Sequence, residues 1–277
     1  MAIADTFERS CQHWSEAGRK GMEQFYALAS FDYVNLAGAL DWPAWFEAQQ
    51  AAVGDRPLKL LDVACGSGKF PTALRQHAAI ERAAIQPVEY SLLDPAAFSI
   101  AEARAALAPP FVPSQEYEAT LQNLECAPGQ FDIVWATHAL YAIPQAELAA
   151  GLTKFVHAMG GAGFIAHASE TAHYLRFYQL YLEGFKDGVG EPYSSAEQLS
   201  ATFADLGVPF RTEQITYENS APCAHDAQVE GYLQRCLFDD SVSLDEMRAN
   251  PATGPYLETC LQDDHWRFRQ NVTLFFL

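Results

Sequence analysis

Apolar runs that alternate with helical patterns narrow the possible folds of this chain more than any other feature. Strands are expected at residues 59–64, 88–93, 116–121, 131–136, 163–168, 210–217 and 267–276. Helical patterns lie at 69–80, 96–107, 145–159, 171–184, 195–206, 229–237 and 244–249. Because parallel strands need long crossover connections, usually helices, this alternation predicts a doubly wound α/β sheet. The stretch 213–226 has little hydrophobic pattern, and we expect an irregular connection there.

Helical additions surround the expected sheet. Residues 6–52 have the apolar spacing of helices, so we assign 1–54 to an N-terminal helical lid segment. Residues 55–277 then form the α/β domain. Helical capping insertions are expected around 171–194 and 220–265, where the regular alternation of strands and helices is interrupted.

Composition argues against several classes of function. The formal net charge is −18 over 277 residues, whereas a nucleic-acid-binding protein needs a basic face for phosphates. Solubility explains the charge most simply, and attraction of a cationic small substrate is the other explanation. No apolar stretch reaches the ~18 residues that span a bilayer, and the first residues lack a signal-peptide pattern. Cysteines without a CxxC pair and histidines without metal-ligand spacing predict a reduced, cytoplasmic protein with no metal site.

The segment LLDVACGSGKF, residues 60–70, places an acid and two glycines directly after a buried strand. In a doubly wound sheet this loop is a usual ligand site, and glycines let the backbone approach a ligand closely. A P-loop needs GxxxxGK[ST], whereas Lys69 has the wrong spacing and is followed by Phe70. A dinucleotide fingerprint needs GxGxxG, whereas Ala64 and Pro71 occupy the first and last of these positions.

An S-adenosylmethionine loop is the third interpretation, and the next strand favours it. Asp94 closes that strand, where a carboxylate can accept both hydroxyls of a ribose. Asp94 also suits the start of the helix PAAFSIAEAR as an N-cap, and both roles can hold together. Asp62 ends the preceding strand at the same crevice. We therefore expect S-adenosylmethionine as the cofactor.

Three segments together, LLDVACGSGKF, LLDPAAFSIAEAR and FDIVWATHALYAIP, resemble class I S-adenosylmethionine-dependent methyltransferases over roughly residues 55–170. The resemblance implies a Rossmann-like, seven-stranded sheet of order 3-2-1-4-5-7-6 with its last strand antiparallel. It implies that the cofactor is bound by Asp62, Ala64, Gly66, Ser67, Gly68 and Asp94. Leu121 and Gln122 would flank the adenine, and Thr137 and His138 would face the methionine part and the substrate.

A narrower likeness extends into the last third of the chain. THALYAIP, SSAEQLSATFADLGV, YENSAPCA and RQNVTLFF are similar in order and spacing to histamine N-methyltransferase. This resemblance implies a small-molecule acceptor that His138 and Asn271 contact. A histidine at 138 replaces the amide of that family, which puts histamine itself in doubt as the acceptor. Glu23 is our assignment for the family's N-terminal acid.

Side chains after the fourth and fifth strands could carry the chemistry. A protonated amine must lose a proton before methylation, and His138 could take it, could position the substrate or could be structural. The segment HYLRFYQLYLEGF places its aromatic side chains on one helix face. Core packing explains most of these rings. Tyr174, together with Tyr141 in ALYAI, is expected to line the pocket, where rings stabilise a cation.

These patterns together predict an S-adenosylmethionine-dependent methyltransferase that acts on a small molecule, through an amine nitrogen. His138, Tyr141 and Tyr174 are the expected catalytic residues. An alternative uses the same fold without methyl transfer. In it, the cofactor's own amino group attacks its γ-carbon and yields azetidine-2-carboxylate and methylthioadenosine. A cofactor-binding protein without catalysis is the third possibility, because all three functions need the same loop.

Overall fold

Eight strands form one mixed sheet in the computed structural model, which describes residues 6–277 except the side chains at 18–20. They are β1 (Lys59–Val63), β2 (Val88–Asp94), β3 (Phe111–Glu118), β4 (Phe131–Thr137), β5 (Met159–Ala168), β6 (Arg211–Pro222), β7 (Leu261–Gln262) and β8 (His265–Phe276). Their order is β3-β2-β1-β4-β5-β8-β6, and the short β7 pairs with β8. β8 runs antiparallel to β5 and β6. With β7 set aside, this is the strand order that the sequence resemblance implies.

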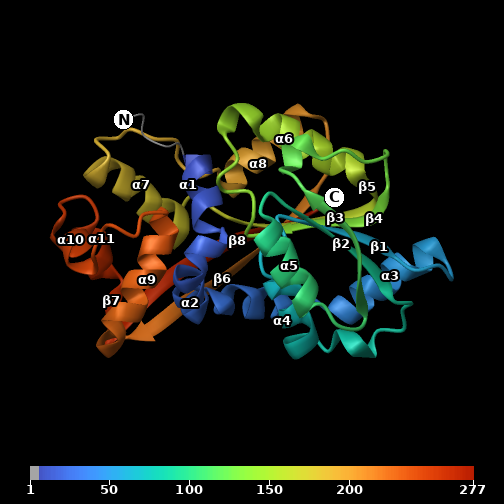
Figure 1. Cartoon of the computed structure of the whole chain (residues 1–277), viewed down its shortest axis with the longest axis horizontal. Helices are drawn as coiled ribbons and strands as arrows, with labels where there is room; N and C mark the ends of the chain where they lie inside the picture. The colour runs from blue at the N-terminus through green and yellow to red at the C-terminus, as the bar shows by residue number, and fades with distance from the viewer. Residues whose placement is uncertain (1–5) are drawn as a thin grey trace.

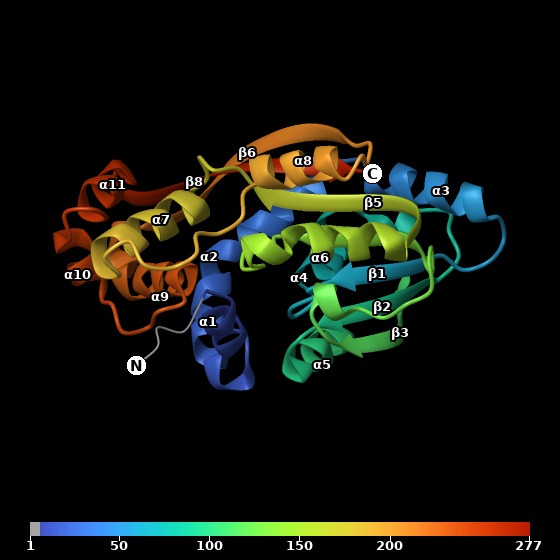
Figure 2. The ribbon, with the colours of Figure 1, turned by 90° about the horizontal axis from the view of Figure 1, so that it is seen from above.

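Helices cover both faces of the sheet (Figures 1 and 2). On one face α3 (Trp42–Val53), α4 (Lys69–His77) and α5 (Ala97–Ala106) pack around Trp42, Phe70 and Ile100. On the other face α6 (Gln145–Ala158) and α8 (Ala196–Asp205) pack around Leu152 and Phe203. A sheet buried on both faces confirms the doubly wound α/β prediction.

A third hydrophobic cluster lies beside the sheet, at the left of Figure 1. It joins α2 (Arg19–Gly38), α7 (His173–Phe185), α9 (Asp226–Leu237), α10 (Leu244–Ala249) and α11 (Gly254–Thr259) to the first half of β8. α1 (Thr6–His13) and α2 lie between this cluster and α5 (Figure 2). Within residues 6–277, no helix has both the length and the apolar character needed to cross a membrane.

The N-terminal helices are tied to the sheet through α3. Asp41 caps this helix, because its side chain accepts the backbone N–H of Ala44 at 3.1 Å. The ring of Trp42 then packs edge-on against Phe70 and Phe164, with centroids 5.3 and 5.1 Å apart. α3 is therefore part of the sheet's own core. Residues 1–5 of the expected lid segment lie outside the described residues.

Two strand predictions were wrong in their extent. β3 begins at Phe111 rather than at 116, and residues 121–123 form a short 3₁₀ turn. β3 is an edge strand with a mostly exposed surface, so its sequence lacks the apolar run of a central strand. The irregular connection expected at 213–226 is instead largely strand, because β6 continues to Pro222 and pairs with β8 along its whole length.

Candidate active site

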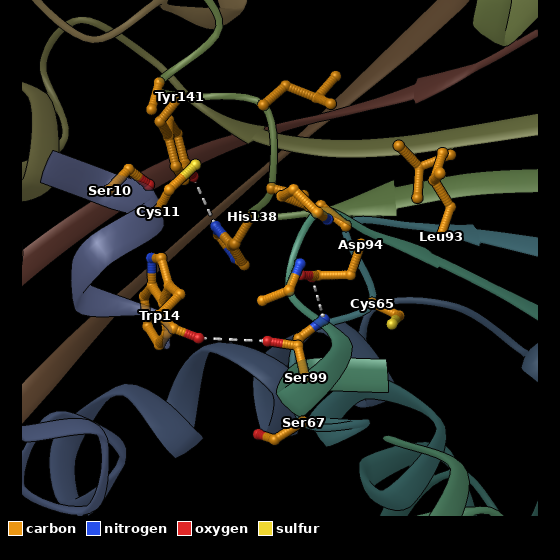
Figure 3. A pocket seen from close by; sticks show the side chains of 18 of the residues that line it. Ser10, Cys11, Trp14, Cys65, Ser67, Leu93, Asp94, Ser99, His138 and Tyr141 are labelled. Carbon is orange, nitrogen blue, oxygen red and sulfur yellow. Dashed lines mark hydrogen bonds between the residues drawn. The ribbon is translucent and has the colours of Figure 1, made fainter. Parts of the chain in front are cut away.

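A cavity of about 530 Å³ lies at the carboxyl ends of β1, β2 and β4, where a doubly wound sheet usually binds its ligand. Its walls come from the glycine loop after β1, the residues after β2, the segment 118–122 and the segment 137–143. α1, α2, α7 and α9 supply the remaining walls. Figure 3 shows α1 residues on the side of this cavity opposite Asp94 and Ser67. The volume suits a small organic ligand.

The glycine loop makes a tight turn at the start of α4. Ala64, Gly66 and Gly68 have φ angles of 53°, 50° and 68°, the left-handed conformation that glycine adopts without steric cost. A Cβ on Gly68 would lie 3.1 Å from the Ala103 Cα of α5. Gly68 does not line the cavity, whereas Ala64, Gly66 and Ser67 do. Gly68 therefore shapes the loop by close packing, and its neighbours face the ligand.

Two buried acids border this loop. Asp94 accepts the Gly66 N–H at 3.1 Å and the Ala96 N–H at 2.9 Å, so it links the loop to the start of α5. Asp62 accepts the Tyr90 hydroxyl at 2.7 Å. Burial raises the pKa of Asp94 and raises that of Asp62 to about 7. Both carboxyls line the cavity, together with the apolar Leu93. These hydrogen-bond acceptors fit a nucleoside that carries ribose hydroxyls and an ammonium group.

The other residues predicted to bind the cofactor also lie at this cavity. Leu121, Gln122 and Thr137 all line it. Leu121 and Thr137 are buried, and Gln122 donates to Glu147 at 2.8 Å on α6. Their placement is compatible with the predicted roles, which stay predictions.

A third acid, Asp32 on α2, lines the cavity and is only 2% exposed. Asn219 of β6 donates to its Oδ1 at 2.9 Å, Tyr174 of α7 donates to its Oδ2, and Tyr217 of β6 gives a third hydrogen bond. Burial raises the pKa of Asp32 to about 6, and the three donors limit this rise because they stabilise the charged form. Asp32 is therefore mainly an anion at neutral pH. No cationic side chain among those described contributes to its pKa.

His138 stands next to this acid, directly after β4. Its φ of 53° is a left-handed conformation that costs a non-glycine residue about 1–3 kcal/mol. Its Nδ1 is 2.7 Å from the Tyr141 hydroxyl (Figure 3), and its Nε2 is 3.2 Å from the Tyr217 hydroxyl. Burial lowers the pKa of His138 to about 4. The imidazole is therefore neutral at physiological pH. His138, Tyr141 and Tyr174 all line the cavity, as expected.

Two residues expected at the substrate are not at the cavity. Asn271 bonds the Thr171 and Thr216 side chains, each at 3.0 Å. Successive strand residues face opposite sides of a sheet, and it is Gln270 of β8 that points toward the third cluster, where it contacts Tyr232. Glu23 is exposed on α2 and does not line the cavity. The structure therefore places neither residue where it could contact a ligand in this cavity.

The acid that lies at the cavity, Asp32, was not among the residues predicted from the sequence. Leu28, Asp32 and Leu36 are spaced by four on α2 and are all buried. An acid on an apolar helix face was a signal for a functional carboxyl, because an unpaired buried charge is costly. Asn219 was missed because it lies beyond the expected strand 210–217, where an irregular connection was expected, and Tyr217, the last residue of that strand, was not singled out.

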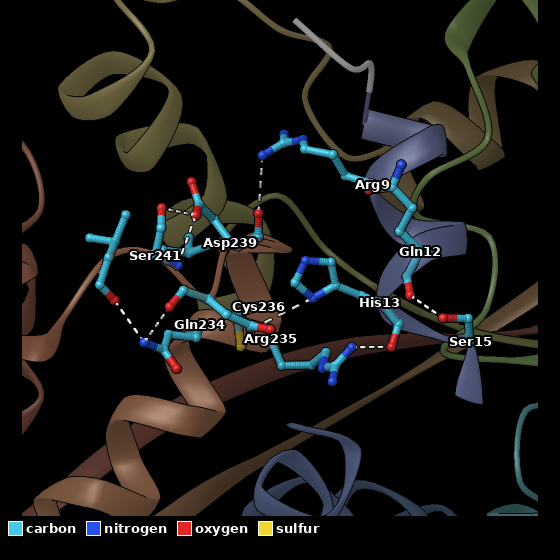
Figure 4. A network of polar contacts seen from close by, with 12 residues as sticks. Arg9, Gln12, His13, Ser15, Gln234, Arg235, Cys236, Asp239 and Ser241 are labelled. Carbon is cyan, nitrogen blue, oxygen red and sulfur yellow. Dashed lines mark hydrogen bonds and ion pairs between the residues drawn. The ribbon is translucent and has the colours of Figure 1, made fainter. Parts of the chain in front are cut away.

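Polar contacts fasten α1 to the third cluster (Figure 4). Arg9 donates to the Tyr181 hydroxyl at 3.2 Å, to the Tyr178 hydroxyl, and to the Leu237 carbonyl at 3.4 Å. Arg235 of α9 donates to the His13 carbonyl at the end of α1. These bonds hold α1 over the cavity, and their partners on α7 and α9 lie far from α1 in the sequence.

Residues 60–163 match the family model described as a methyltransferase domain. No curated protein matches the chain in sequence. Magnesium protoporphyrin IX methyltransferase from Synechocystis, solved with bound S-adenosylhomocysteine, has a TM-score of 0.53 and 12% identity over 97% of this chain and 99% of its own. The YcgJ protein of Bacillus subtilis has a TM-score of 0.52 and 14% identity over 83% of this chain and 94% of its own. At such identities these structures show the fold alone.

The family match and the geometry agree. The matched residues run from β1 into β5 and include the glycine loop and the acid that ends β2. The sheet has the strand order expected of the class I fold. The cofactor is S-adenosylmethionine, and its loop lies at the cavity. Residues 60–163 are therefore an S-adenosylmethionine-dependent methyltransferase domain, and the sheet that contains them has the class I fold.

Proposed function

We propose that this enzyme methylates the nitrogen of a small amine. The observation that carries the proposal is Asp32, a buried anion in the wall of the cofactor cavity. A buried charge is expensive unless an opposite charge meets it. Because no described cationic side chain does so, a positively charged ligand is the natural partner of Asp32. An ammonium group has that charge, and it can give the carboxylate both a charge pair and a hydrogen bond.

Aromatic side chains around Asp32 support the same chemistry. Tyr33 on α2, Tyr141 after β4 and Tyr174 on α7 line the cavity beside it. Ring faces attract a cation by about 0.5–2 kcal/mol each, depending on how well water is excluded. The wall therefore favours a cationic group over a neutral one. Because the acceptor shares one cavity with the cofactor, it has to be small.

The residues of this chain would act mainly by placement. When bound, S-adenosylmethionine supplies a methyl group that is activated by a sulfonium and transferred in line to a nucleophile. Asp62 and Asp94 would orient the cofactor from the loop side, with Ala64, Gly66 and Ser67 providing backbone contacts. Asp32 would hold the ammonium form of the acceptor and accept one of its protons. Good alignment alone can be worth about 7–11 kcal/mol of the barrier.

We also propose a domain organisation around this site. The segment 1–54 contributes a lid, formed by α1 and α2, and residues 55–277 form the cofactor-binding domain. The insertions around 171–194 and 220–265 supply Tyr174 and Tyr193, and Arg235 and Phe238, to the cavity wall.

A second candidate is cyclisation of the cofactor itself, and the way α1 covers the site favours it. Ser99 of α5 donates to the Trp14 carbonyl at 3.5 Å (Figure 3), so the segment after α1 reaches across to the cofactor side. Asp32 and the glycine loop line the same covered cavity. An amino group already inside this cavity, that of the cofactor, could therefore meet Asp32 in place of an external amine.

Product analysis separates the two reactions. The purified protein is incubated with S-adenosylmethionine, with and without a pool of small amines, and the nucleotides are identified by mass spectrometry. S-adenosylhomocysteine that appears only with the amines supports the proposal and puts the acceptor in the pool. Methylthioadenosine without any amine would instead support cyclisation. Asp32→Asn should reduce product formation in either case, because both reactions use an amine nucleophile.

A further inference from the structure

We infer that His138 and Tyr217 are positioning residues that keep Asp32 ready to receive the proton of the amine, and that His138 itself takes no proton from the substrate. This inference rests on the proposed amine chemistry for its purpose. Its physical content concerns only the chain's own hydrogen bonds, so it is tested without any substrate.

A continuous chain of hydrogen bonds connects the backbone of β5 to Asp32. The Ala168 N–H lies 3.2 Å from the Tyr141 hydroxyl, and this hydroxyl lies 2.7 Å from His138 Nδ1. His138 Nε2 lies 3.2 Å from the Tyr217 hydroxyl, which bonds Asp32. The chain thus runs from Ala168 through Tyr141, His138 and Tyr217 to the carboxylate.

The backbone end is compatible with one direction for all of these bonds. An amide N–H can only donate, so the Tyr141 oxygen accepts from Ala168. The single proton of Tyr141 is then free to point at His138, and Nδ1 can accept it. A neutral imidazole with an accepting Nδ1 carries its proton on Nε2. In that arrangement Nε2 donates to the oxygen of Tyr217.

The acid end requires the same direction. An ionised carboxylate has no proton to donate, so Tyr217 must use its only proton to bond Asp32. Its oxygen is then left to accept from His138 Nε2. The acid end therefore demands the Nε2–H form of His138, and the backbone end is compatible with it. Every bond in the chain points toward Asp32.

This direction decides what His138 can do. Its one accepting nitrogen is taken by Tyr141, so it has no lone pair with which to remove a proton from a substrate. Burial disfavours the doubly protonated ring as well. The left-handed backbone at His138, held by a bond from its N–H to the Ala166 carbonyl at 2.9 Å, keeps the ring between the two tyrosines. His138 therefore acts through Tyr217, on Asp32.

Asp32 is the proton acceptor that remains. The titratable groups that face it are Tyr33 on the same helix, Tyr141 after β4, Tyr174 on α7, Tyr217 on β6, and Tyr232 and Cys236 on α9. Burial raises the pKa of every one of them, so all are neutral at physiological pH. In the proposed step an ammonium N–H bond breaks, its proton binds Asp32, and a neutral amine with a free electron pair remains. Methylation of that amine gives a methylammonium product and S-adenosylhomocysteine.

The first test reads the histidine directly. Protein labelled with ¹⁵N at histidine is studied by long-range ¹H–¹⁵N correlation, and His138→Gln identifies the signals of residue 138. We expect one neutral form with the proton on Nε2, unchanged from about pH 5 to about pH 8. A proton on Nδ1, or a titration near the ordinary histidine pKa, would overturn the inference.

The second test reads the acid. The infrared carbonyl stretch of a protonated buried carboxyl is followed against pH, and subtraction of the Asp32→Asn spectrum isolates Asp32. Tyr217→Phe removes one donor to the charged form, so the midpoint of Asp32 should rise by about one to two pH units. His138→Ala should raise it less, and His138→Gln, whose amide can both donate and accept, should restore it. Asp62, which titrates in the same spectra, is the internal control and should not move.

An unchanged Asp32 midpoint in Tyr217→Phe would show that Tyr217 donates elsewhere, and the inference would be wrong. Tyr217→Phe removes only a hydroxyl, so it keeps this test available if His138→Ala does not fold. Failure of the amine assay with these two results in place would reject the proposed function and leave the hydrogen-bond chain standing. If the amine assay succeeds but the Asp32 midpoint does not move in Tyr217→Phe, the hydrogen-bond chain is rejected and the proposed function stands.

Discussion

The Gly66 N–H donates to the Asp94 carboxylate at 3.1 Å, so the glycine loop after β1 is tied to the acid that ends β2. The same carboxylate accepts the Ala96 N–H at the start of α5. One side chain thus sets the conformation of the loop and offers its remaining lone pairs to the cavity. The prediction that Asp94 is the N-cap was wrong, because Ala96 is the N-cap of α5 and Asp94 bonds the Ala96 N–H just before the helix. The ribose contact stays a prediction.

Asp94→Ala should weaken binding of S-adenosylmethionine by about 1–3 kcal/mol, the cost of losing hydrogen bonds to a charged acceptor. Calorimetric titration measures this loss. Asp94→Asn, which keeps one oxygen for the backbone N–H groups, should lose less. An affinity that stays the same in Asp94→Ala would contradict the ribose assignment.

Asp32→Asn should reduce kcat/KM for an amine acceptor by about 2–5 kcal/mol, because it removes the buried partner of the ammonium group. Affinity for S-adenosylhomocysteine should change little, since the cofactor loop is untouched. Glu23→Gln is the matched control, being an acid on the same helix that is exposed and outside the cavity. Equal losses in the two variants would remove the special role of Asp32.

The stability of the cofactor-free protein should depend on pH through Asp62. Its pKa is raised to about 7 in the folded state, whereas an unfolded aspartate titrates near ~3.9. Between these values the folded state binds more protons than the unfolded state, so stability falls as pH rises from about 4 to about 7. Each pKa unit corresponds to about 1.4 kcal/mol.

Urea unfolding of the wild type and of Asp62→Asn, compared across this pH range, measures the contribution. The wild type should lose up to a few kcal/mol relative to the variant, and most of the difference should appear below about pH 7. A constant difference between the two proteins would show that Asp62 ionises normally in the folded state.

Arg9→Met should loosen α1, because it removes the bonds to Tyr178, Tyr181 and the Leu237 carbonyl (Figure 4). We expect faster proteolysis after α1 and faster cofactor release by stopped-flow fluorescence, with a loss of about 1–3 kcal/mol. Arg104→Met on α5, which breaks only an exposed ion pair with Glu116 of β3, should behave like the wild type. Unchanged release in Arg9→Met would argue against a lid formed by α1.

Much of the fold could be predicted from the sequence, because central strands leave a local signal. β1, β2 and β4 are buried on both faces and so appear as apolar runs. β3 at the edge and the second half of β6 lack that signal, since their polar residues are satisfied by solvent or by neighbours from other segments. Asn219 is one such residue, and its partner Asp32 lies 187 positions away in the sequence.

The sequence by itself determined the cofactor loop and the acids beside it, because a strand, a tight turn and a helix start are built from consecutive residues. Only the tertiary structure decided which side chains complete the cavity. Strand register turns Gln270 toward the third cluster and leaves Asn271 outside the site, and the packing of α2 on β6 brings Asp32 rather than Glu23 to the cavity. Side-chain direction depends on pairing and packing between segments far apart in the chain, and no local pattern encodes it.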